Sequence, residues 1–409
     1  MSGQAAVVPD HVPTDRVVDL DIYALPNQDA GLHKAWAEIQ AQHPELIWTP
    51  RNEGHWIATR GDVLREVQGD HERFSNRVIV LPKSVGEHHA LIPTTIDPPE
   101  HKPYRRLLND ALALGKVRGL EEAIREAAAD LVDGFAGDGH CNFTEQYAEV
   151  FPIRIFLKLV DLPEEDSPRV RHWAHCMTRP GMDMAFEDAR AAFYEYLDPV
   201  IRARREQGGN DMISAMLEAD MGGRQLSHEE ALSLVTQVLI AGLDTVVNFL
   251  GFAITELARN AGVRARFIAE PALILPAANE FFRRYSTVTV AREVREDMEY
   301  RGVNLRAGDM IAVPTAVHGI DPAVNDDPLT IDVDRRGGRH SAFGNGPHMC
   351  PGQELARREV AITIEEWLKR IPDFRIAEDS DLSVIGGIAP SLTRVCLAWD
   401  SEAQGEDQR

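Results

Sequence analysis

The chain has 409 residues, of which 44% are hydrophobic and 26% are charged. This composition is typical of a globular protein with a large core and excludes an intrinsically disordered chain. The formal net charge of −22 argues against general binding of nucleic acids, which requires a basic face.

The cysteines and the apolar stretches indicate where such a protein works. The four cysteines lie far apart and form no CxxC pair, so we expect a reducing compartment, the cytoplasm, and no disulfide framework. The first 21 residues resemble neither a signal peptide nor a membrane anchor. The most apolar stretch, 234–258, is interrupted by polar residues and predicts a core helix that does not span a membrane.

The pattern in the N-terminal third predicts a helix over 31–43, followed by paired strands at 46–48 and 55–58. Asp97 and the two prolines after it predict the start of a helix over about 100–114. The middle of the chain reads as almost wholly helical. We expect helices over 120–135, 143–159, 168–178, 186–207, 211–219 and 227–260, the last being the longest and most apolar.

The C-terminal third predicts a helix over about 271–285, short strands at 288–290, 298–300, 303–305 and 310–313, and a last helix over 353–370. The segment 321–346 lacks regular periodicity, and long loops of this kind are usually functional. The chain is therefore predicted to be mainly α with a minor β part (α+β). We expect one domain over 1–409, with loosely held ends at about 1–10 and 401–409.

One cysteine lies in an unusual sequence context. Cys350 lies in Phe343-Gly344-Asn345-Gly346-Pro347-His348-Met349-Cys350-Pro351-Gly352, directly before the last predicted helix. The glycines allow the backbone to approach a flat group closely, and the helix N-terminus favours a thiolate. The alternative, a buried structural cysteine, is accepted for Cys141, Cys176 and Cys396. A zinc cage is disfavoured because His340 and His348 alone supply too few further ligands.

An acid and an alcohol stand side by side in the longest predicted helix, within Ala241-Gly242-Leu243-Asp244-Thr245-Val246. Such a pair could deliver protons into an apolar site. The alternative is that Thr245 bonds back to a backbone carbonyl and that Asp244 pairs with a surface arginine.

Together these segments resemble the cytochrome P-450 superfamily. The cysteine segment matches the haem-binding signature Phe-Gly-x-Gly-x-x-x-Cys-x-Gly at every defined position, and 241–245 matches [Ala/Gly]-Gly-x-[Asp/Glu]-Thr. The resemblance implies the P-450 fold, a triangular helical domain whose long central helix crosses the haem. It also implies haem b with Cys350 as the metal ligand, and a monooxygenase in which Asp244 and Thr245 are catalytic.

The resemblance also implies roles for residues outside these motifs. Glu280 and Arg283, in isolation a surface ion pair, become a buried pair that braces the loop before Cys350, and Arg179 becomes the partner of Asp244. The residues expected to contact the cofactor are His101, Arg105, Arg292, His348, Phe343, Gly344, Ala241 and Gly352.

Further stretches, among them 55–61, 151–156, 242–250 and 355–359, resemble the bacterial camphor-hydroxylating family. The expected pocket departs from that family. His89 stands where the family has a tyrosine, Val80 where it has a phenylalanine, and Gln237 where it has a leucine. The predicted substrate-binding residues are Val80, His89, Leu91, Thr94, Phe186, Gln237, Ile240, Val288 and Ala389, with Ala241 beside them. We therefore expect a small apolar terpenoid or norisoprenoid ketone, camphor-like or ionone-like, as the substrate.

The resemblance implies a [2Fe–2S] ferredoxin, reduced by an NADH-dependent reductase, as electron donor. Lys102, Arg105, Arg106 and Arg339 are candidates for its docking patch. We expect a monomer that binds neither nucleic acid nor membrane. Three alternatives remain open: a peroxide-driven haem-thiolate enzyme, a non-catalytic haem-thiolate sensor, and a structural zinc protein or plain helical binding protein. The Asp244–Thr245 pair argues against the first two.

Overall fold

The computed structural model describes residues 5–179 and 182–400. Helices dominate this part of the chain, and the strands come mainly from its two ends, which confirms the prediction of a mainly α fold with a minor β part. The helices are α1 Leu32–Gln42, α2 Gly61–Gly69, α3 Lys83–Gly86, α4 His101–Ala111, α5 Leu114–Gly119, α6 Glu121–Asp133, α7 Phe151–Leu159, α8 Ser167–Thr178, α9 Phe186–Gln207, α10 Met212–Glu218, α11 His228–Arg259, α12 Ala261–Ala269, α13 Ile274–Arg284, α14 Ala316–Gly319 and α15 Gln353–Arg370.

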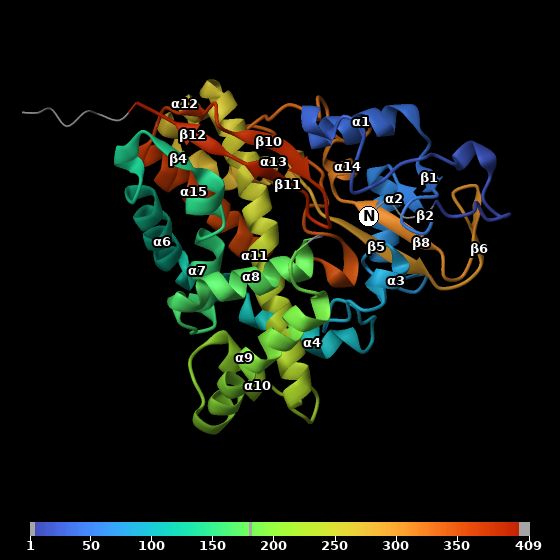
Figure 1. Ribbon diagram of the computed structural model, residues 1–409, viewed down its shortest axis with the longest axis horizontal. Helices are drawn as coiled ribbons and strands as arrows, with labels where there is room; N and C mark the ends of the chain where they lie inside the picture. The colour runs from blue at the N-terminus through green and yellow to red at the C-terminus, as the bar shows by residue number, and fades with distance from the viewer. Residues whose placement is uncertain (1–4, 180–181, 401–409) are drawn as a thin grey trace, which may run out of the picture.

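The strands form small sheets beside the helices (Figure 1). The strands are β1 Leu46–Thr49, β2 His55–Ala58, β3 Phe74–Ser75, β4 His140–Asn142, β5 Thr289–Val294, β6 Met298–Tyr300, β7 Val303–Leu305, β8 Met310–Pro314, β9 Arg375–Ile376, β10 Asp381–Ile385, β11 Ser391–Arg394 and β12 Cys396–Ala398. The largest sheet has the order β1-β2-β8-β5-β3, and β1 and β2 pair antiparallel, with Leu46 opposite Ala58. This sheet joins the first and last thirds of the chain.

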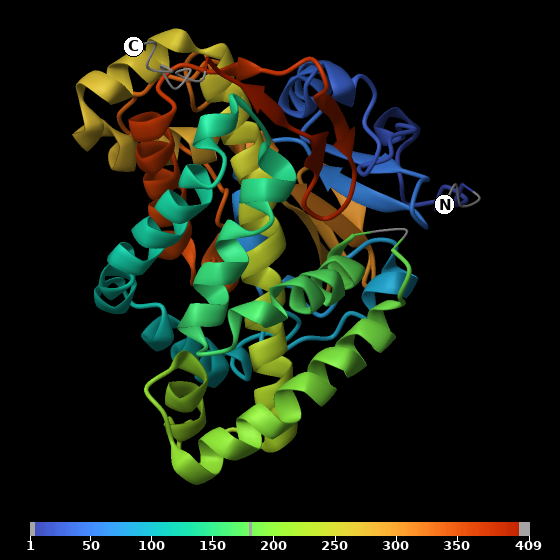
Figure 2. The same cartoon turned by 60° about the vertical axis from the view of Figure 1, so that its left-hand side comes forward.

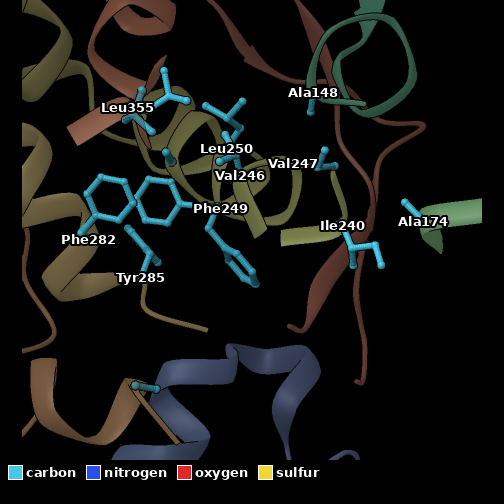
Figure 3. Packing of buried hydrophobic residues seen from close by; sticks show 14 of the residues in the cluster. Ala148, Ala174, Ile240, Val246, Val247, Phe249, Leu250, Phe282, Tyr285 and Leu355 are labelled. Atoms are coloured by element: carbon cyan, nitrogen blue, oxygen red, sulfur yellow. The ribbon is translucent and has the colours of Figure 1, made fainter. Parts of the chain in front are cut away.

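Helix α11 runs through the middle of the helical part and contacts α7, α8 and α9 (Figures 1 and 2). It begins at a capping box, in which Ser227 accepts from the Glu230 amide while the Glu230 carboxylate accepts from the Ser227 amide. Its apolar side chains enter the core. Val246, Phe249 and Leu250 lie close to Phe282 of α13 and Leu355 of α15 (Figure 3). The long central helix is therefore an internal support for the elements around it.

Among the described helices, α11 is the one whose length and composition would suit a membrane span, with a hydropathy of 1.8 over its most apolar stretch. Of that stretch, 76% is buried inside the protein. This agrees with its prediction as a core helix.

Several boundaries differ from the predictions. Asp97 does not cap α4: its carboxylate accepts from the Ser75 hydroxyl and from the Asn76 amide at 2.8 Å, because a tertiary contact takes the oxygen that a cap would use. The helix expected over 143–159 is a π-type turn at Thr144–Ala148 followed by α7, and α12 was not predicted as a separate helix. The expected loose ends fall mostly outside the described residues, but Ala6 donates to the Pro50 carbonyl at 2.8 Å and is held.

Candidate haem site

The loop before α15 presents the sulfur of Cys350. Gly344 and Gly346 have φ values of 72° and 68°, a left-handed conformation that favours glycine. A Cβ atom on Gly346 would lie 2.8 Å from the Gln68 carbonyl oxygen, so this position has no room for a side chain. The Cys350 amide donates to the Phe343 carbonyl at 2.7 Å and closes the loop. The backbone thereby fixes the cysteine directly before the helix.

Phe343 anchors this loop to the helices behind it. Its ring centroid lies 4.6 Å from that of Phe282, and the guanidinium of Arg357 lies 4.7 Å from it. Phe282 in turn stacks on Phe249 of α11 at 4.1 Å, as Figure 3 shows. Phe343 and Gly344, both predicted cofactor contacts, do not line the cavity described next. Phe343 instead positions the loop through aromatic packing.

A cavity separates this loop from α11. It is lined by Pro93, Thr94, His101, Arg105, Leu108, Leu112, Phe156, Gln237, Val238, Ala241, Gly242, Thr245, Val246, His348, Cys350, Pro351, Gly352, Leu355, Ala356 and Glu359. The α11 members are adjacent pairs four residues apart, 237/238, 241/242 and 245/246, which is the spacing of one helix face. Cys350 lies on the opposite side. Cys396 does not line the cavity but lies buried in β12, with Asn142 as its neighbour across the sheet.

The surroundings of Cys350 do not by themselves lower the pKa of its thiol. Burial raises its pKa, and the backbone hydrogen bond with Gly352 and the charges of Arg105 and Arg357 only partly oppose this. The helix N-terminus that the sequence suggested as a thiolate stabiliser is therefore outweighed by desolvation. A metal ion at the sulfur would supply the missing stabilisation.

Three buried nitrogen atoms near the cavity lack a hydrogen-bond partner: Nε2 of His101, Nε of Arg292 and Nε2 of His348. The two histidine rings lie 4.1 Å apart. Burial lowers the pKa of His101 to about 4 and that of His348 to about 2, so both rings are neutral at pH 7. Arg292 remains a cation, although burial lowers its pKa to about 10. Unpaired buried polar groups are costly, and these would be satisfied by the carboxylates of a bound haem.

Arg105, the fourth predicted propionate contact, borders the same cavity. Its guanidinium donates to the Met349 carbonyl in the cysteine loop. It therefore joins α4 to the loop from within the site.

Asp244 and Thr245 point in different directions. Thr245 lines the cavity, and its hydroxyl donates to the Ala241 carbonyl at 2.9 Å. Asp244 is 3% exposed and does not line the cavity. Its Oδ1 accepts from Nε of Arg179 at 3.0 Å and from Nη2 at 2.7 Å. Both contacts of the alternative interpretation are therefore present, and Arg179 is the partner that the resemblance implied.

Two further groups complete the surroundings of Asp244. Nε2 of His175 lies 3.9 Å from its carboxylate, and burial followed by the charge of Arg179 lowers the pKa of this histidine to about 4. Glu149 lies 3.8 Å from Arg179, and burial raises its pKa despite Arg171 and Arg179. Sequence reasoning missed both residues. The signal for His175 was its position in the last turn of the helix predicted over 168–178, four residues before Arg179.

Glu280 and Arg283 form a buried ion pair, with Nε–Oε2 and Nη2–Oε1 distances of 2.7 Å. Arg283 also donates to the carbonyls of Gly319, Pro328 and Thr330, while Glu280 accepts from the Asp332 amide and from Arg335. The pair thus holds the irregular segment that leads to the cysteine loop.

Most of the predicted substrate contacts lie away from this cavity. Thr94 and Gln237 line it, whereas Val80, His89, Leu91, Phe186, Ile240, Val288 and Ala389 do not. The His89 ring packs on Phe186 with a centroid distance of 3.9 Å, so the start of α9 covers it. Conversely, the cavity contains Phe156 and Glu359, which the sequence did not single out.

The chain is similar in sequence and structure to known proteins. The family model described as cytochrome P450 matches residues 174–379. A curated relative, "Probable cytochrome P450 127A1" of Sinorhizobium fredii, is 33% identical over 96% of this chain and 97% of its own length. The crystal structure of CYP101J2 is similar with a TM-score of 0.92 and 46% identity, covering 97% of this chain and 100% of that one. The crystal structure of cytochrome P450 CYP101C1 gives a TM-score of 0.90 and 37% identity, covering 96% and 100%.

Proposed function

The chain belongs to the cytochrome P450 family, and from this premise we propose that it hydroxylates a small apolar terpenoid or norisoprenoid ketone with O₂ and electrons from a [2Fe–2S] ferredoxin. It is a haem b monooxygenase, and it resembles the camphor-hydroxylating enzymes as predicted. The proposal depends above all on the cavity between Cys350 and the α11 face around Thr245. We further propose that the chain acts as a single-domain monomer in the cytoplasm.

Cys350 is the proposed ligand of the haem iron, and His101, Arg105, Arg292 and His348 are the proposed contacts of its propionates. Support comes from the three unpaired buried nitrogens and from the closed loop that presents the sulfur. Haem with a thiolate ligand supplies oxygen activation that favours cleavage of the O–O bond.

Asp244 and Thr245 are proposed to deliver protons to the site. Thr245 lines the cavity, and its hydroxyl, which now donates to the Ala241 carbonyl, can still accept a hydrogen bond there, whereas the Asp244 carboxylate lies on the side of α8. Proton transfer would require the Asp244 side chain to leave Arg179 and turn toward Thr245. The paired position of Asp244 would keep bulk water from reaching the cavity by this route.

The substrate proposal comes from the altered side chains at Val80, His89 and Gln237. Gln237 adds an amide to the α11 side of the lining, next to Val238 and one helical turn from Ala241. Nδ1 of His89 contacts the Val85 carbonyl at 2.9 Å, which places the single proton of the neutral ring on Nδ1. Donation to a ketone would therefore require the His89 ring to turn away from Val85. Spin-state titration with camphor and β-ionone tests this proposal. We expect tighter binding of β-ionone, and tighter binding of camphor would contradict it.

The ferredoxin proposal is supported by exposed cations on α4, the helix that Arg105 joins to the cysteine loop, and before that loop in the sequence, in an otherwise acidic protein. Lys102, Arg106 and Arg339 are exposed, whereas Arg105 is half-buried and turned toward Met349. A complex with an acidic ferredoxin should weaken as the salt concentration rises. Substrate-dependent NADH consumption with ferredoxin and reductase separates this enzyme from a peroxide-driven enzyme or a sensor.

The ligand assignment is tested by the absorption of the reduced protein under carbon monoxide. The wild type should give the red-shifted band typical of thiolate-ligated haem, and Cys350→Ser should lose it. Cys396→Ser is the matched control, because this cysteine is buried in β12 away from the cavity. Retention of the band in Cys350→Ser would contradict the assignment.

A further inference from the structure

A second group of possible metal ligands lies outside the haem site, where α8 ends. His172 and Cys176 are four residues apart on α8 and share one face of the helix. Asp183 comes from the segment between α8 and α9. The Nε2, Sγ and Oδ1 atoms of the three residues lie within 4.8 Å of one another.

The spacing of these atoms agrees with one face of a tetrahedron around zinc. Sγ of Cys176 lies 3.8 Å from Nε2 of His172 and 3.6 Å from Oδ1 of Asp183, and Nε2 lies 3.4 Å from Oδ1. Tetrahedral zinc, with Zn–S of about 2.3 Å and Zn–N or Zn–O of about 2.0–2.1 Å, requires edges of about 3.5 Å to sulfur and about 3.3 Å between nitrogen and oxygen. All three edges are therefore within a few tenths of an ångström of the required lengths.

We propose that His172, Cys176 and Asp183 form a binding site for a divalent cation of borderline softness, of which Zn²⁺ is the type. The nitrogen, sulfur and oxygen donors suit zinc, whereas Mg²⁺ and Ca²⁺ prefer oxygen ligands alone. Binding would displace the thiol proton that Cys176 now donates to Asp183, and that proton would go to solvent. With three protein ligands, the fourth position is left to water.

The site is accessible and close to the proposed proton-delivery residues. The side chains of His172 and Asp183 are 41% and 73% exposed, so an ion can enter, while Cys176 is buried beneath them. In the sequence, Arg179 stands between Cys176 and Asp183. A bound ion would therefore tie together the two flanks of the residue that holds Asp244.

The experiment is equilibrium dialysis of chelator-treated holoenzyme against Zn²⁺, with bound zinc counted per haem. We expect a tight site in the wild type whose affinity falls by more than about 100-fold in Cys176→Ser and in His172→Ala, since loss of an outer-sphere partner alone costs about 10–100-fold. Zinc should also raise the melting temperature of the wild type and leave that of Cys176→Ser unchanged. Mg²⁺ at the same concentration should do neither.

The chain supplies a matched control. His140, Asp379 and Cys396 form another cluster with the same three donor types, in which His140 and Asp379 lie 3.1 Å apart. His140→Ala should therefore leave zinc binding intact if the site is the one proposed. Loss of binding in His140→Ala, unchanged binding in Cys176→Ser, or no tight site in the wild type would each overturn the proposal.

Discussion

Arg179, at the end of α8, holds Asp244 of α11 through two hydrogen bonds of 3.0 and 2.7 Å to the same carboxylate oxygen. Asp244 is buried, while Arg179 is partly exposed, so the pair links the interior of α11 to the surface. A carboxylate in this position has two alternatives: it stays with the arginine, or it turns toward the cavity that Thr245 lines. The proposed proton delivery depends on exchange between the two.

Replacement of Asp244 by Asn should slow turnover by about 100-fold or more while leaving substrate affinity nearly unchanged, because a general acid–base group contributes about 10²–10⁴. The measurement is NADH-coupled product formation, together with the spin-state titration. A larger solvent deuterium isotope effect in the variant would identify proton transfer as the slowed step. Glu149→Gln, which alters a neighbour of Arg179 but not Asp244, should have a much smaller effect. Equal turnover of Asp244→Asn and wild type would contradict the proposed role.

The Glu280–Arg283 pair predicts a large loss of stability when it is broken from one side. In Glu280→Gln the buried guanidinium of Arg283 loses its charged partner, which typically costs about 3–5 kcal/mol. We expect a lower free energy of unfolding and reduced haem content, since the loop toward Cys350 depends on this pair. Glu270→Gln breaks the exposed pair with Arg266 and should cost less than about 1 kcal/mol. Similar losses in both variants would show that burial of the first pair has no special effect.

Local signals in the sequence predicted most of the helices. The apolar periodicity predicted a helix over 227–260, and the structure has α11 at His228–Arg259, begun by the Ser227 capping box. Predictions failed where contacts between distant segments determined the local structure. Asp97 had the chemistry of a helix cap, but Ser75, Asn76 and Arg295 use its carboxylate.

For the site, too, the sequence predicted the local motif but not the contacts between distant segments. The loop around Cys350 is a contiguous segment whose conformation follows from Gly344 and Gly346, so a motif was enough to find it. The walls of the cavity come from α4, α7, α11 and α15, which meet only in the folded chain. Glu359 shows what the sequence could not predict. A carboxylate on a helix is normally solvated, and only the packing of the folded chain buries this one.

Loss of the capping box of α11 should lower the stability of the protein by a modest amount. Ser227→Ala removes the acceptor of the Glu230 amide and should lower the free energy of unfolding by about 1 kcal/mol. Ser227→Asn, which can still cap, should restore most of it, and denaturant titration measures both. An effect of the same size in the two variants would mean that the hydroxyl does not stabilise the helix as a cap.

Glu359 predicts an unusual dependence of stability on pH. Burial raises the pKa of this carboxyl to about 8 from a model-compound value of 4.5. The folded protein therefore keeps the proton that the unfolded chain releases above pH 4.5. The contribution of Glu359 to stability is fully present below pH 4.5 and is lost as the pH rises toward 8. Glu359→Gln has no proton to lose, so it should become more stable than the wild type with rising pH, by up to about 4 kcal/mol at pH 8.

Glu366 on the same helix provides a control of opposite sign. Burial tends to raise its pKa, but hydrogen bonds with Lys369, Arg125 and Arg370 outweigh burial and lower it. Its carboxylate therefore stabilises the fold above the unfolded pKa, and this contribution is lost as the pH falls through the lowered pKa. Urea unfolding at pH 5, 6.5 and 8 should show Glu359→Gln gaining stability relative to the wild type with rising pH, while Glu366→Gln is destabilised throughout. A stability difference between Glu359→Gln and wild type that stays constant over this range would mean that Glu359 ionises normally.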